Sequence, residues 1–88
     1  MIKTIEHFFD AYFHQDWRED YKSSIDAVRD FSESEPESKK ELASILGGFL
    51  ELESIPDNLI QKYGGNFDPK SENLTIEEWL QKVIEILK

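Results

Sequence analysis

Two histidines and an aspartate are placed where they would share one face of an N-terminal helix. His7, Asp10 and His14 are spaced i, i+3, i+7, which would align two imidazoles and a carboxylate. These side chains are ligand types for a divalent transition metal. A single exposed helix supplies no fourth ligand from a second element, so we interpret the three residues as a solvated polar face. We expect neither a metal nor a cofactor.

Two further patterns are similar to ligand or carrier motifs without matching them. The segment 68–79 fails as a calcium loop because Lys70 and Leu74 occupy ligand positions and Trp79 stands where the twelfth-position glutamate should be. Ser54 is distantly similar to the modified serine of acyl carrier proteins, but Pro56 interrupts that motif. An acidic helical adaptor or acyl-carrier-like protein therefore remains as the alternative function.

The composition argues against an enzyme. The 88 residues include no cysteine and only two histidines, which excludes thiol nucleophiles, disulfide frameworks and zinc–thiolate sites. The sequence also lacks a Ser/His/Asp arrangement and a phosphate-binding glycine loop. We expect a single domain that acts by binding.

The elements that position these residues are predicted to be helices. Ile5, Phe8, Phe9, Tyr12 and Phe13 follow the helical i, i+3, i+4 spacing and predict an amphipathic helix over about 3–14. A loop is predicted for 16–22. A second helix over 25–33 follows, capped by Ser23 or Ser24. Since no segment shows sustained strand alternation, we predict an all-α bundle of four to five short helices.

The second half continues this pattern. A third helix is predicted over 36–53, although Gly47 and Gly48 in its interior require either a bend or a closely packed second helix. A short helix after Pro56 should be stopped by Gly64-Gly65-Asn66, which can supply a left-handed C-terminal residue. A loop is predicted over 67–74. The pair Thr75 and Glu78 forms a capping box for a last helix over 76–87.

Acidic residues dominate the charge, chiefly in the N-terminal part. The net charge is −9, of which residues 1–37 carry −6 with ten acids and four bases. Such a field repels nucleic acid and anionic membranes and attracts basic partners. No apolar run reaches the length of a signal peptide core or a membrane span. We therefore expect a cytoplasmic protein that binds neither nucleic acid nor membrane.

The most distinctive string is Tyr12-Phe13-His14-Gln15-Asp16-Trp17, followed by Asp20 and Tyr21. It resembles the N-terminal signature of the immunity proteins of bacterial contact-dependent growth inhibition systems. The likeness continues through Ile25–Phe31, the Glu35-Pro36 break and the segments around Phe67 and Trp79. It therefore extends over most of the chain as a pattern.

This resemblance implies a small inhibitor that protects its cell by binding a cognate toxin domain. Many such toxins are nucleases and therefore basic, so an acidic inhibitor suits them. The aromatic residues Tyr12, Phe13 and Trp17 are expected mainly in the core, and the chain is expected to be a monomer outside the complex. We predict that the toxin contacts the acid-rich stretch. Its members are Asp16, Glu19, Asp20, Asp26, Asp30, Glu33, Glu35 and Glu37.

Overall fold

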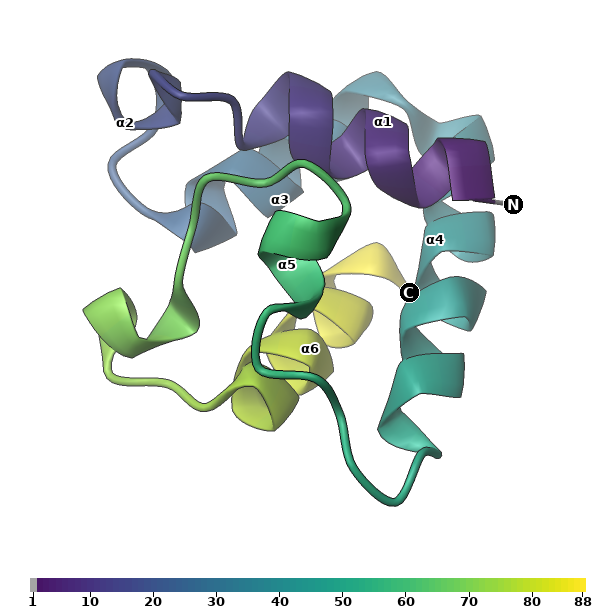
Figure 1. Cartoon of the computed structure of the whole chain (residues 1–88). Helices are drawn as coiled ribbons and strands as arrows, with labels where there is room; N and C mark the ends of the chain where they lie inside the picture. Colours follow the sequence, from purple (N-terminus) through teal and green to yellow (C-terminus); the bar gives the residue numbers. More distant parts are fainter. Residues whose placement is uncertain (1) are drawn as a thin grey trace.

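The structure is a computed structural model that describes the backbone of residues 2–88 and the side chains of residues 3–88. Within that part of the chain the regular secondary structure consists of helices, with no strand, which confirms the all-α prediction. Figure 1 shows α1 along the upper edge, α4 down the right side and α6 in the lower centre. The Cα radius of gyration is 11.8 Å. Four of the six α-helices in residues 2–88 have eleven residues or more.

The first helix, α1, spans Ile2–Tyr12. It ends two residues earlier than predicted, but Phe13 still donates its backbone N–H to the Phe9 carbonyl. The predicted apolar face is confirmed, because all of its members are buried: Ile5, Phe8, Phe9, Tyr12 and Phe13. The helix packs against both α3 and α4.

The prediction of a loop over 16–22 is wrong in its middle, where Trp17–Asp20 forms the short helix α2. Trp17 is buried, and its indole N–H donates to the Asn66 carbonyl over 2.9 Å. This contact between residues far apart in the sequence anchors α2, which is too short for its residues to show a helical pattern of apolar positions. The next helix, α3, spans Ser24–Ser34, and Ser23 caps it as predicted by accepting from the Asp26 N–H.

Helix α4 spans Pro36–Leu50 and ends three residues before the predicted boundary. A Cβ built on Gly47 or on Gly48 would meet no atom within 4 Å outside the helix backbone. The explanation that a second helix packs closely against these glycines is therefore wrong. Each glycine costs the helix about 1 kcal/mol relative to alanine, and no contact within the described residues compensates for it.

The C-terminal part contains α5 (Leu59–Lys62), the 3₁₀ helix η1 (Pro69–Glu72) and α6 (Ile76–Leu87). Gly64 follows α5 with φ of 95°, which confirms the predicted left-handed residue. The predicted 67–74 loop contains η1, whose turn is capped by the Asp68 side chain. The α6 bounds and its capping box agree with the prediction.

The core is an aromatic cluster between α1, α3 and α6. Phe8 meets Phe31 edge-on at 4.9 Å between ring centroids, and Phe67 packs against Trp79 at 5.3 Å. Phe13 contacts both Trp17 and Trp79. Aliphatic residues of α4, α5 and α6 complete the buried core, among them Leu42, Leu46, Leu59, Ile60, Leu80 and Val83. None of the helices in residues 2–88 has the combination of length and hydropathy that a membrane span requires.

Candidate partner-binding surface

Glu35, at the junction of α3 and α4, receives hydrogen bonds from α1. The Tyr12 hydroxyl donates to Glu35 Oε2 over 2.7 Å, and His7 Nε2 lies 3.0 Å from both carboxylate oxygens. Partial burial of Glu35 opposes ionisation, but the bonds from Tyr12 and His7 prevail and lower the pKa of this carboxyl. Burial and the same carboxylate raise the pKa of Tyr12 to about 12.

Asp30 holds a second tyrosine in the same way. The Tyr21 hydroxyl donates to Asp30 Oδ2, and the Ser34 hydroxyl donates to Oδ1 over 3.0 Å. Burial and the Asp30 carboxylate raise the pKa of Tyr21. The two tyrosine–carboxylate pairs are neighbours, because Ser34, which donates to Asp30, directly precedes Glu35. The charge of Asp30 also raises the pKa of Tyr12. We call these four residues, Tyr12, Tyr21, Asp30 and Glu35, the tyrosine–carboxylate seam.

The predicted trio of His7, Asp10 and His14 does not converge on one point. His7 bonds Glu35, whereas His14 Nε2 lies 3.3 Å from Asp20 Oδ2 and its Nδ1 accepts from the Asp16 backbone N–H. No group of three potential metal ligands occurs among the side chains that the structure describes. Each imidazole instead lies against one acid of the predicted stretch, His7 against Glu35 and His14 against Asp20.

The structure places the eight predicted acids in three kinds of position. Asp20, Asp30 and Glu35 accept hydrogen bonds from histidine, tyrosine or serine side chains within the chain. Asp26 is half-buried in the first turn of α3. The remaining four are exposed: Asp16, Glu19, Glu33 and Glu37. These exposed carboxylates are the ones that a partner reaches without first breaking an internal bond.

Sequence reasoning missed a buried polar cluster formed by Ser24, Glu72 and Trp79, which we call the Ser24 junction. Glu72 accepts from the Ser24 backbone N–H over 2.8 Å and from its hydroxyl over 2.6 Å. The Trp79 indole N–H donates to the same hydroxyl oxygen over 2.9 Å. The junction ties η1 and α6 to the first turn of α3, where the helix dipole favours an anion. Only the position of Ser24 near a helix start hinted at a role.

Ser54 lies in the segment between α4 and α5, five residues before α5 begins. A modified serine of the carrier type would stand at a helix N-terminus, and this position does not provide one. The structure therefore gives the carrier alternative no support.

Taken together, the described residues form a small helical protein with an aromatic core, and four of the predicted acids lie exposed on its surface. The chain matches the family model of the CdiI immunity proteins over residues 1–87, and it belongs to this family. The resemblance seen in the sequence is thereby confirmed. No curated protein and no solved structure matches the chain significantly.

Proposed function

We propose that this immunity protein neutralises its cognate toxin domain one-to-one, by covering it with the acidic surface of α2, α3 and the start of α4. The toxin is basic, and a nuclease fits best because its nucleic-acid channel is positively charged. The protein acts in the cytoplasm and is a monomer until the toxin arrives. It contributes no catalytic step of its own.

The observation that carries this proposal is the exposed acid set in a chain of the CdiI family. The exposed acids are among the ten that, with four bases, give residues 1–37 a net charge of −6: Asp16, Glu19, Glu33 and Glu37. Opposite charges on two proteins raise the association rate towards 10⁸–10⁹ M⁻¹s⁻¹ at low salt, by order of magnitude. Rapid capture is what an inhibitor of a lethal enzyme needs.

The size of the molecule suits such a complex. A standard interface covers about 800 Å² per partner, which is roughly 15% of the 5507 Å² of accessible surface here. The seam holds Tyr12 and Tyr21 by their hydroxyls, so a partner meets a surface whose polar groups are already ordered. Ordering before contact lowers the entropic cost of association.

Charge reversal tests the proposal. A triple variant with Glu19, Glu33 and Glu37 changed to Lys should weaken toxin binding about a hundredfold or more in calorimetry, and the affinity of the wild type should fall as salt rises. The matched control changes Asp57, Glu77 and Glu85 to Lys, which are exposed acids outside α2, α3 and the start of α4. Equal affinities for the two triple variants would refute the proposed surface.

A further inference from the structure

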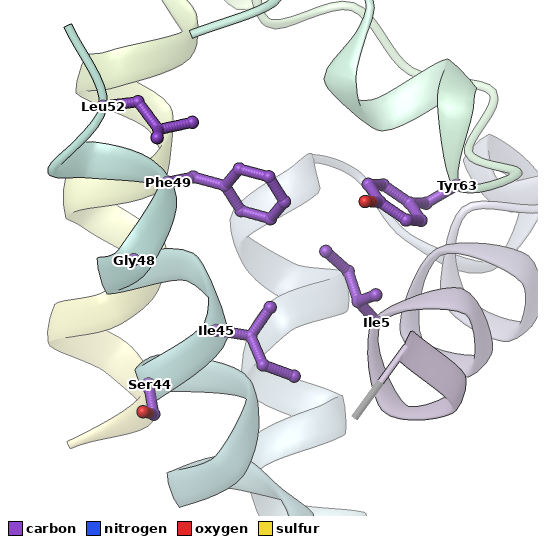
Figure 2. A pocket seen from close by; sticks show the side chains of 7 residues that line it. All are labelled: Ile5, Ser44, Ile45, Gly48, Phe49, Leu52 and Tyr63. Atoms are coloured by element: carbon purple, nitrogen blue, oxygen red, sulfur yellow. The ribbon is translucent and has the colours of Figure 1, made fainter.

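An apolar hollow of ≈ 400 Å³ opens between α1, α4 and the residue that follows α5. Ile5, Ile45, Phe49 and Tyr63 surround it, and Figure 2 shows their side chains directed towards a common space. Leu52, just beyond α4, lies at its upper edge in this view and is 51% exposed, an unusual state for so large an apolar side chain. The hollow is therefore a water-facing apolar surface outside the core.

Gly48 is one of the residues that line the hollow. A Cβ in its place would meet nothing within 4 Å. Its φ does not lie in the left-handed region, where Gly64 and Asn73 are found. The backbone therefore does not require glycine at this position. A larger side chain would favour the helix, and because this position lines the hollow we expect it to reduce the space there.

The surroundings of the hollow are acidic and lead to the tyrosine–carboxylate seam. Tyr63 also lines a neighbouring polar hollow that contains Glu6, His7, Asp10 and Lys62. His7 in turn bonds Glu35 of the seam. On the other side of the apolar hollow, Leu52 is flanked in sequence by two exposed glutamates. An apolar group that enters here therefore meets negative charge on both sides.

We propose that this hollow receives a large apolar side chain of the toxin domain, presented next to a lysine or arginine. This inference rests on the proposed function and adds to it the chemistry of the anchor. An apolar side chain buried in a pocket, with charged groups around it, is the usual form of an interface hot spot. The acids beside the hollow select a cationic neighbour, and the apolar walls exclude water from the contact.

Filling the hollow tests the proposal without removing any existing contact. Gly48→Leu should lower the affinity for the cognate toxin domain at least tenfold, while the unfolding temperature stays equal or rises. Gly47→Leu is the matched control, because Gly47 does not line the hollow and has equally free space for a Cβ. Leu52→Asn, which removes apolar surface at an exposed position without adding charge, should weaken binding in the same direction. A photo-crosslinking residue at position 52 should capture a toxin segment that contains an apolar residue beside Lys or Arg.

The outcomes separate this inference from the proposed function. If the wild type binds the toxin and the acid-to-lysine triple variant does not, but Gly48→Leu binds normally, the hollow is not the anchor site and only this inference fails. If the wild type does not bind the toxin at all, both fail. If Gly48→Leu instead abolishes self-association in sedimentation experiments while toxin affinity is unchanged, the occupant is a second copy of the chain and the inference is overturned.

Discussion

Carboxylates meet hydroxyl groups in two regions of this molecule, with different consequences. At the Ser24 junction, Glu72 accepts a backbone N–H and a hydroxyl of a residue that is fully buried. At the tyrosine–carboxylate seam, Glu35 accepts from Tyr12 and faces His7, while 27% of its side chain and 51% of that of His7 remain exposed. The donors of the junction, Ser24 and Trp79, are fully buried, and Glu72 is partly exposed. At the seam, Tyr21, Asp30 and Glu35 are all partly exposed.

This difference separates acids that hold the fold from acids that meet a partner. A buried donor that loses its acceptor cannot turn to water, so the full desolvation cost appears in stability. An exposed donor exchanges its partner for water at little cost. The number of acids in a segment therefore does not identify an interface, and the exposure of each carboxylate must be known as well.

The largest effect is expected at the junction. Glu72→Ala should destabilise the protein by roughly 3 kcal/mol, because it leaves the Ser24 N–H and hydroxyl without their acceptor. Urea unfolding followed by circular dichroism measures this loss. The control is Glu19→Ala, an exposed change expected to stay within about 0.5 kcal/mol. A loss below about 1 kcal/mol for Glu72→Ala would mean that the buried donors of the junction do not depend on Glu72.

The fold was predictable from the sequence wherever local signals sufficed. The Thr75–Glu78 capping box and the apolar period after it gave the bounds of α6, and Ser23 marked the start of α3. Helix α2 was not predicted because four residues are too few to show a helical pattern of apolar positions. The hydrogen bond that anchors it, between Trp17 and Asn66, joins residues far apart in the chain. Such long-range contacts override local propensity.

The candidate site was predictable only in its charge. The acid-rich stretch can be read from the sequence, but nothing in it indicates that Asp30 and Glu35 hold the hydroxyls of Tyr21 and Tyr12. Tyr12 was correctly expected in the core, and its hydroxyl donates to Glu35, which is partly exposed. The partnership of Glu72 with Ser24 spans 48 positions and leaves no local pattern.

Two glycines extend the comparison of buried and exposed regions. Gly65 is buried, and a Cβ there would lie 2.4 Å from Ile60 Cγ2, so Gly65→Ala should destabilise the protein by about 2 kcal/mol. Gly48 faces open space, and Gly48→Ala should stabilise it by about 0.5–1 kcal/mol. Thermal unfolding of both variants shows whether the free energy of unfolding falls for Gly65→Ala and rises for Gly48→Ala. Changes of the same sign would contradict the contrast between a filled region and an open one.

A smaller loss is expected when a seam hydrogen bond is removed. Tyr21→Phe should cost about 1 kcal/mol, less than the change at the junction, because Asp30 keeps its bond from Ser34 and water reaches the half-buried carboxylate. Denaturant unfolding at neutral pH measures the difference. The same substitution at Tyr63, whose hydroxyl does not meet the seam, serves as the control. If Tyr21→Phe lowered the free energy of unfolding as much as Glu72→Ala does, the seam would be part of the buried core.

The smallest effect concerns acid pH and Glu35. Because the pKa of Glu35 is lowered in the folded protein, its contribution to stability is complete above the ordinary carboxyl pKa of 4.5 and disappears as the pH falls through the lowered value. The difference in unfolding free energy between wild type and Glu35→Gln should be about 0.5–1 kcal/mol at neutral pH. It should approach zero in strong acid, where the wild-type carboxyl is also uncharged.

Glu33→Gln, at an exposed position, should show little difference at either pH. A difference for Glu35→Gln that stays constant from neutral to acid pH would mean that the charge of Glu35 does not hold Tyr12 and His7. The seam would then rest on neutral hydrogen bonding alone, like the Ser24–Trp79 contact of the junction.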